Sequence, residues 1–256
     1  SALGVGTFSR VTRVVLKGDR GQNKKSYACK QLKQELLSNV GDFIKAAAEL
    51  AYEAFVLSCF YHPNIIRLRG LPEDGIASFG DAVNETQEIH VYPATSFFLI
   101  MDVLQETLDQ RIQRWKTISR PQSLFEMRKR TIEKLSLCKQ LADVLEYIHS
   151  KGVVYRDLKP QNIGFCEQEG GVLKLFDFGL SRELPMSIGE AASSTDSNPN
   201  EHVRFELSGM VGTIRYMAPE VCLSQPYNRD CDIYSWSIVS WEIWSEIKPF
   251  ETFTPD

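Results

Sequence analysis

The segment from Cys231 to Trp244, CDIYSWSIVSWEIW, constrains the fold more than any other part of the sequence. Its apolar residues fall on nearly every side of a helix, and a helix that is apolar all round is normally buried. A chain of 256 residues, of which 43% are apolar, can bury a substantial core. We therefore expect a buried helix here, in a chain that forms one large domain or two lobes.

The N-terminal third follows a different pattern. Residues 1–35 alternate as strands, RVTRVVLKG and KKSYACKQL, with the turn GDRGQN between them. Helical periodicity runs from Asn39 to Phe60, HPNIIRLRGL predicts a turn and a strand, and SFFLIMDVL predicts a short buried strand. Residues 72–96 are polar and predict a long loop. The pattern is typical of a strand-rich front that contains one helix.

The remaining two thirds are mainly helical. TLDQRIQRW begins a helix, residues 116–130 suggest a basic linker, and TIEKLSLCKQLADVLEYIHSKG is an amphipathic helix closed by Gly152. Short strands are expected near 163–166 and 172–176, and residues 185–202 are expected to be mobile. The whole order predicts an α+β fold.

Composition narrows the class of protein. A net charge of −4 argues against a general nucleic-acid binder. The six cysteines form no CxxC pair, so a disulfide framework or metal site is not expected, and a reducing, cytoplasmic location is favoured. No apolar run approaches the roughly 20 residues of a membrane span, and no signal peptide is evident. Both ends look cut, because neither has a tail or a terminal cap.

A glycine-rich segment opens the chain. GVGTFSRV carries Gly4, Gly6, Ser9 and Val11, and glycines at this spacing let backbone N–H groups approach phosphates. A strand follows the motif, whereas a dinucleotide fingerprint leads into a helix. Alone the motif is weak, because a hairpin turn has the same letters.

A lysine in the second expected strand is the next candidate. Lys30 and Ala28 alternate and should face the same side, where a small alanine leaves room for a flat ring. A glutamate on the following helix could hold the ammonium group against phosphates, and both Glu53 and Glu49 are placed to do so. A solvated strand lysine is the alternative.

The motif VVYRDLKPQN carries the clearest chemistry. Asp157 could accept a hydroxyl proton, Lys159 could neutralise a transferring phosphate, and Asn162 could bind Mg²⁺. Asp177, in LFDFGLSR, would complete a hard oxygen site for the metal. Each segment alone could be a plain strand-end turn, but all of them in this order is improbable.

Taken together, the chain resembles the eukaryotic protein kinases. The likeness runs in family order through the Gly-rich loop, YACK, HPNIIRL, YRDLKPQN, DFG, GTIRYMAPE and DIYSWSIVSWEIW. It implies a bilobal α+β fold: a small antiparallel-sheet lobe with one helix at 1–101, a hinge at 102–104, and a larger, mainly helical lobe at 105–256. The resemblance also implies that this lobe is C-terminally truncated.

The resemblance assigns roles to single residues. Lys30 would bind phosphates and pair with Glu53, which lies nine residues before His62 of HPN. Asp157 would be the catalytic base, Lys159 the γ-phosphate contact, and Asn162 and Asp177 the Mg²⁺ ligands. The implied ATP-binding residues are Leu3, Gly4, Gly6, Val11, Ala28, Lys30, Met101 as gatekeeper, the backbones of Asp102 and Leu104, Asn162 and Asp177.

The implied activity is ATP- and Mg²⁺-dependent phosphorylation of Ser or Thr in protein substrates. DLKPQN and GTIRYMAPE resemble Ser/Thr kinases, and Trp241 and Glu242 lean toward the tyrosine-kinase-like group. Two rivals remain: a pseudokinase that acts as an ATP-binding or docking module, and a small-molecule kinase of related fold. GTIRYMAPE argues against the second, because that segment shapes a groove for peptides in the family.

The chain departs from the family pattern at three positions: Ser9 replaces the third glycine, Tyr155 replaces a histidine, and Gly164 replaces a leucine that packs under adenine. The last change implies weaker ATP affinity. The resemblance also links Arg156 to an upstream activating kinase, because a phosphate in the following loop could pair with this arginine. The acceptor residues considered are Ser193, Ser194, Thr195, Ser197 and Ser208.

Overall fold

The computed structural model describes residues 2–15, 25–73, 97–117, 123–166, 169–185 and 204–251. The chain forms two compact units. Unit 1 contains Ser1–Gln105, Cys166–Val172 and Asp177–Gly179; unit 2 contains Glu106–Phe165, Leu173–Phe176 and Leu180–Asp256. The lobe limits expected from the sequence, with a hinge at 102–104, stay a prediction.

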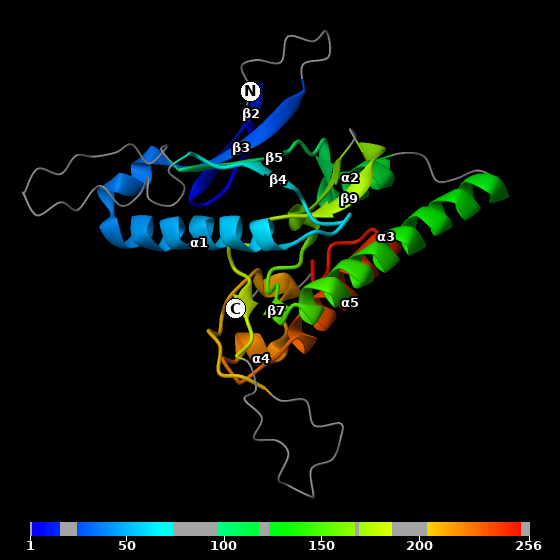
Figure 1. Cartoon of the computed structure of the whole chain (residues 1–256). Coiled ribbons are helices and arrows are strands. Elements are labelled where there is room, and N and C mark those ends of the chain that lie inside the picture. The colour runs from blue at the N-terminus through cyan, green and yellow to red at the C-terminus, as the bar shows by residue number, and fades with distance from the viewer. Residues whose placement is uncertain are drawn as a thin grey trace, which may run out of the picture. The chain divides into compact units, whose positions relative to one another are not determined.

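Unit 1 is built on a five-stranded sheet with the order β1-β2-β3-β5-β4 and antiparallel neighbours throughout (Figure 1). Its strands are β1 (Ala2–Val5), β2 (Ser9–Val15), β3 (Ser26–Leu32), β4 (Leu68–Gly70) and β5 (Phe98–Asp102). The strand-rich front is therefore confirmed. The expected turn GDRGQN and nearly all of the expected loop at 72–96 lie outside the described residues.

One long helix, α1 (Val40–Cys59), accompanies the sheet, after the 3-10 turn η1 (Gln34–Ser38). Asn39 caps it, because its side-chain oxygen accepts hydrogen bonds from the first free N–H groups of the helix. The buried side chains recur at helical spacing and form one face: Ala46, Leu50, Glu53, Ala54, Val56 and Leu57. The helix expected from Asn39 to Phe60 is confirmed.

Unit 2 is mainly helical. It contains α2 (Leu108–Thr117), α3 (Leu124–Ser150), α4 (Pro219–Cys222) and α5 (Asp230–Ser245). The helices α3 and α5 pack side by side (Figure 1). The Trp236 indole donates to the Cys138 carbonyl at 3.0 Å, and Lys134 donates to the Trp244 carbonyl at 3.1 Å. A mixed α+β architecture with a helical back half is thus confirmed.

The expected basic linker over 116–130 is wrong for its second half. Helix α3 begins at Leu124, seven residues earlier than the amphipathic pattern suggested. Ser123 accepts from the Glu126 backbone N–H, and the Glu126 side chain accepts from the Ser123 N–H, which is a complete capping box. The letters SLFE carry this signal at the sequence level. Helix initiation therefore outweighs the local run of positive charge.

The expectation that α5 is buried on all sides is also wrong. Ile233, Trp241 and Trp244 are 48%, 49% and 43% exposed. The helix packs mainly against α3 and the 3-10 turn η6 (Ile214–Tyr216), so one face is covered and the opposite face is half-exposed. The helix therefore has apolar residues on every side, but only one of its faces is buried.

Short strands of unit 2 frame the segment that carries Asp157. The strands β6 (Glu106–Thr107), β8 (Ile163–Cys166) and β9 (Val172–Leu175) form one sheet, and β7 (Val153–Val154) pairs with β10 (Arg182–Glu183). The expected strands near 163–166 and 172–176 are confirmed. In the part of the chain that the structure describes, no helix is long and apolar enough to cross a membrane.

Candidate active site

One face of the unit 1 sheet gathers five of the residues that the sequence analysis selected. Gly4 lies opposite Val11, Val11 opposite Lys30, and Ala28 opposite Met101. Directly opposed residues of antiparallel strands project to the same side, and so do residues two apart on one strand. The register therefore aligns a glycine, three apolar side chains and one ammonium group on a single surface.

The other proposed nucleotide contacts of unit 1 lie at the ends of strands. The Gly6 N–H donates to the Ser9 carbonyl at 2.9 Å and closes the turn after β1, while Leu3 on β1 is 37% exposed. Asp102 ends β5, and its buried carboxylate accepts from Arg69 Nε at 2.6 Å. Leu104 follows two residues later. That the backbones of 102 and 104 bind adenine stays a prediction.

Lys30 is held between two carboxylates within unit 1. Its Nζ lies 2.5 Å from Glu53 Oε2 and 2.8 Å from Asp177 Oδ1. Burial would lower the pKa of Lys30, but the nearby charges of Asp177 and Glu53 outweigh it and raise that pKa. Burial raises the pKa of Glu53, and the ammonium group of Lys30 acts in the opposite direction. Lys30 therefore stays charged.

The DFG segment brings Asp177 to this lysine. Asp177 has a left-handed backbone (φ 65°), which a non-glycine residue adopts only where its surroundings hold it. Phe178 is fully buried and packs edge-on against Phe60, with ring centroids 5.9 Å apart. Glu49, the alternative partner for Lys30, lies instead against Gly179, where an added Cβ would be 3.5 Å from Glu49 Cβ.

A network in unit 2 surrounds the carboxylate of Asp157. Lys159 Nζ donates to Asp157 Oδ2 at 2.7 Å, and Thr213 Oγ1 donates to Asp157 Oδ1 at 2.9 Å. Lys159 also donates to Thr213 Oγ1 at 2.8 Å. The carboxylate is only 7% exposed, so these bonds fix its orientation. A base, a cation and a hydroxyl group thus form one closed triangle.

Asn162 is fixed to the same loop. It ends the 3-10 turn η3 (Pro160–Asn162), and its Nδ2 donates to Asp157 Oδ2 at 2.8 Å and to the Asp157 carbonyl at 2.9 Å. Both bonds use the amide nitrogen, so the side-chain oxygen takes no part in them. Oxygen is the donor that Mg²⁺ prefers.

Asp232 is a positioning group that sequence reasoning missed. This fully buried carboxylate accepts from the Tyr155 N–H at 2.8 Å, the Arg156 N–H at 2.7 Å and His149 Nε2 at 2.8 Å. It therefore holds the backbone directly before Asp157. A carboxylate inside an otherwise apolar helical run demands buried partners, and that signal was available in the sequence.

Arg156 joins the loop that carries Asp157 to the segment before GTIRYMAPE. Its Nε donates to the Leu180 carbonyl at 2.7 Å, and its Nη1 donates to Ser208 Oγ at 2.8 Å. Of the five phosphate acceptors considered, Ser208 is described and exposed, and the other four lie outside the described residues. Tyr155, which replaces the family histidine, donates its hydroxyl to the Phe176 carbonyl.

Two glycines allow this segment to pack closely. A Cβ on Gly212 (φ 104°) would lie 2.5 Å from the Arg156 carbonyl oxygen, and a Cβ on Gly209 would lie 2.6 Å from Ser224 Cα. Real Cβ atoms do not approach other atoms so closely. Only hydrogen fits at both positions.

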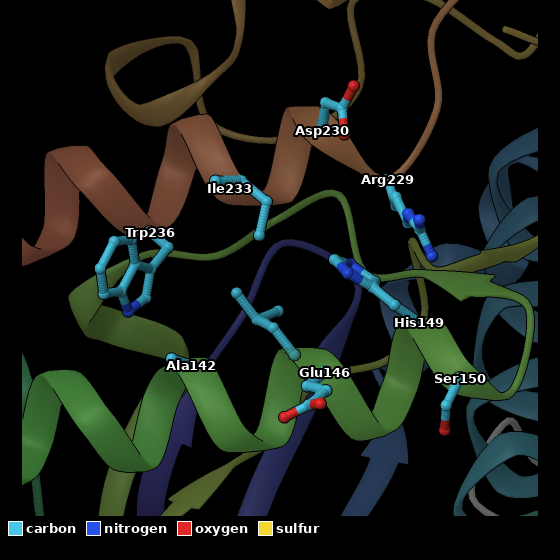
Figure 2. A pocket seen from close by; sticks show the side chains of 9 residues that line it. Ala142, Glu146, His149, Ser150, Arg229, Asp230, Ile233 and Trp236 are labelled. Atoms are coloured by element: carbon cyan, nitrogen blue, oxygen red, sulfur yellow. The ribbon is translucent and has the colours of Figure 1, made fainter. Parts of the chain in front are cut away.

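A cavity of about 410 Å³ lies elsewhere in unit 2, between α3 and α5 (Figure 2). Ala142, Leu145, Ile233 and Trp236 form its apolar part, and its polar residues are Glu146, His149, Ser150, Arg229 and Asp230. None of the catalytic or nucleotide-binding residues proposed from the sequence lines it. The cavity meets the groups described above at His149, which lies 2.8 Å from Asp232 Oδ2.

The chain is similar to protein kinases of several organisms, over nearly its whole length or over about half of it. It is 27% identical over 249 residues to cAMP-dependent protein kinase type 3 of Saccharomyces cerevisiae (97% of this chain, 48% of that protein). It is 29% identical over 255 residues to the putative ribosomal protein S6 kinase alpha-2 of Caenorhabditis elegans (97% and 26%). It is 36% identical over 121 residues to the serine/threonine/tyrosine-protein kinase HT1 of Arabidopsis thaliana (47% and 26%).

These alignments cover about half or less of each relative's own length. The family comparison covers nearly all of this chain: the protein-family model described as "Protein kinase domain" matches residues 1–255. With the order of its motifs and its mixed α+β fold, the chain belongs to the protein kinase domain family.

Proposed function

We propose that this domain transfers the γ-phosphoryl group of ATP to serine or threonine side chains of protein substrates. The observation that carries the proposal is the closed triangle of Asp157, Lys159 and Thr213 in unit 2. It combines a carboxylate that can accept a hydroxyl proton with a cation beside it that can neutralise a phosphoryl group. The relatives named above are themselves called protein kinases, two of them without reference to tyrosine.

The residues of unit 1 supply the second half of the proposal. Lys30 would bind the α- and β-phosphates, and Glu53 would keep its ammonium group in place. The 2.8 Å pair between Lys30 and Asp177 brings the proposed phosphate-binding lysine next to a proposed metal ligand. The sheet face with Gly4, Val11, Ala28 and Met101 would receive the nucleotide base and phosphates, with further contacts from Leu3, Gly6, Asp102 and Leu104.

Asp177 and Asn162 are proposed as magnesium ligands on the chemistry of each side chain by itself. Asp177 offers a carboxylate whose side chain is 44% exposed, and Asn162 offers an amide oxygen that takes no part in its two hydrogen bonds to Asp157. Both are hard oxygen donors, which suit Mg²⁺ and not a soft metal. Bound there, Mg²⁺ would neutralise charge on the phosphates of ATP. Asp177 would have to exchange its bond with Lys30 for the metal.

Asp157 would act as the base in this reaction. Because Thr213, Lys159 and Asn162 already donate to its carboxylate, an incoming substrate hydroxyl must displace one of them or take a remaining lone pair. Thr213 is the natural group to yield, because its hydroxyl can rotate. Lys159 would then face the transferred phosphoryl group. A cytoplasmic location and activation by an upstream kinase stay predictions.

The test is single-turnover transfer from γ-labelled ATP to a Ser/Thr peptide library, with and without Mg²⁺. Asp157→Asn and Asp177→Asn should each abolish transfer, whereas Asp143→Asn, in an exposed pair with Lys139, should leave it intact. Magnesium-dependent ATP binding without any transfer would favour the docking-module alternative. Transfer to small alcohols but not to peptides would favour a small-molecule kinase.

A further inference from the structure

The guanidinium group of Arg156 is anchored by hydroxyl groups. Its Nη1 donates to Ser208 Oγ at 2.8 Å and to Tyr227 Oη at 2.9 Å. The arginine is 6% exposed and Tyr227 is 1% exposed, so the second bond is shielded from water. Hydrogen bonds to a buried charge are stronger than those between neutral groups. The neutral hydroxyl oxygens of Ser208 and Tyr227 therefore accept the hydrogen bonds of Nη1 of the Arg156 guanidinium group.

Tyr227 connects three segments through one side chain and its backbone. Its hydroxyl donates to the Ser208 carbonyl at 2.7 Å while it accepts from Arg156. Its backbone exchanges two hydrogen bonds with Phe205, at 2.9 and 3.0 Å. The single hydroxyl proton and one lone pair are thus both used. Removing that oxygen would take one hydrogen bond from Arg156 and one from the Ser208 carbonyl at the same time.

Arg156 needs such support because its backbone is strained. Its φ of 71° lies in the left-handed region, which a non-glycine residue occupies only when the surroundings hold it. Asp232 holds its N–H at 2.7 Å, Leu180 holds its Nε, and Tyr227 holds its Nη1. The next residue is Asp157. The orientation of the proposed base therefore depends on how firmly this arginine is anchored.

We propose that Tyr227 is a positioning residue that fixes Arg156, and with it Asp157, without any phosphate in the loop that precedes GTIRYMAPE. The proposal rests on the proposed kinase function. It differs from the expectation that a loop phosphate could pair with Arg156 and order the segment, because two hydroxyl groups already accept hydrogen bonds from Nη1 of this arginine. Ser208 acts here as an unmodified acceptor.

The first test compares Tyr227→Phe with the wild-type chain, both treated with a protein phosphatase and checked by intact mass. The variant keeps the ring and loses only the hydroxyl. We expect kcat to fall about tenfold while KM for ATP and for peptide stays within about twofold, since the lost interaction orients a group that acts in the transition state. Phosphatase treatment of the wild type should leave its kcat unchanged.

A second test separates positioning from a general loss of stability. Trp236→Phe is the control: Trp236 donates its indole N–H to the Cys138 carbonyl at 3.0 Å, so the variant loses one hydrogen bond of unit 2 that does not involve Arg156. Assayed well below both melting temperatures, this control should keep its kcat. In an Arg156→Met background, which lacks the donor group, Tyr227→Phe should lower kcat by less than about twofold.

Several results would overturn the proposal. A wild type that loses activity on phosphatase treatment would show that a phosphate is required. An equal fall in kcat in the Arg156→Met background, or for Trp236→Phe, would show a merely structural effect. If the wild type transfers no phosphate in any state, the proposed function fails. Hydrogen exchange over residues 204–213 then tests the positioning role, which predicts faster exchange in Tyr227→Phe than in Trp236→Phe.

Discussion

Asp232→Asn should destabilise unit 2 far more than a single neutralised surface charge. The carboxylate accepts three hydrogen bonds, of 2.7 to 2.8 Å, and is completely buried. An asparagine amide has one acceptor oxygen and one donor nitrogen. If the amide oxygen accepts from the Arg156 N–H, the amide nitrogen faces the Tyr155 N–H. If the amide is flipped, the amide nitrogen faces the Arg156 N–H instead. Either orientation leaves at least one buried N–H unpaired.

The magnitude follows from this count. An unpaired buried N–H costs about 1–3 kcal/mol, and the remaining bonds lose their charge-assisted strength, so we expect a loss of about 2–4 kcal/mol in the free energy of unfolding. Asp230→Asn is the matched control, because Asp230 lies in the same first turn of α5 and shares any interaction with the helix dipole. That control should lose no more than about 1 kcal/mol.

Urea unfolding followed by tryptophan fluorescence measures the difference directly. All four tryptophans belong to unit 2: Trp115, Trp236, Trp241 and Trp244. The signal therefore reports on the unit that contains Asp232. Equal slopes against urea would show that the two variants unfold the same surface. If Asp232→Asn lost less than about 1 kcal/mol beyond Asp230→Asn, the account of an obligatory three-bond acceptor would be refuted.

Three further predictions use other parts of the chain. Glu53→Gln should lower kcat/KM about 10- to 100-fold, because Lys30 loses a charged partner but keeps Asp177, while Glu49→Gln on the same helix should have little effect; equal effects would contradict the assignment. Gly164→Leu should lower KM for ATP about 5- to 30-fold, equivalent to ~1–2 kcal/mol of apolar contact, and an unchanged KM in steady-state assays would contradict it. Burial raises the pKa of Glu242, although the Tyr216 hydroxyl acts the other way. A carboxyl group with a raised folded pKa contributes to the free energy of unfolding below its unfolded pKa. That contribution is lost as the pH rises through its folded pKa. Glu242→Gln should therefore gain stability relative to the wild type as the pH rises above about 4.5, the ordinary pKa of this carboxyl group, and urea titrations showing a constant difference would exclude this linkage.

Local signals in the sequence predicted the elements well and their partners less well. The strand alternation around Ala28 and Lys30 gave the shared face that the sheet register has. Choosing Glu53 over Glu49 needed a spacing taken from the family, because the two residues lie about one helical turn apart and helical phase alone does not separate them. The capping box at Ser123 was readable but was masked by the surrounding positive charge.

The long-range contacts lay beyond single-sequence reasoning. Tyr227 and Arg156 are 71 residues apart, and nothing in either local pattern indicates that one hydroxyl meets one guanidinium. Asp232 could be suspected as a buried acid, but its partners at Tyr155 and Arg156 depend on how α5 packs under the loop. The sequence did not predict the half-exposed face of α5, because the hydropathy of a helix does not show which of its faces other elements cover.

Gly209 and Gly212 are the two positions where only a hydrogen atom fits as the side chain. Together they fix the number of residues between two backbone contacts. Each marks a point where the backbone touches a different neighbour, Ser224 at one and the Arg156 carbonyl at the other. One residue inserted between them would shift a side chain into one of these contacts, although no catalytic group had changed. Natural variation in loop length should therefore occur before residue 209. The spacing of three residues between Gly209 and Gly212 should stay constant.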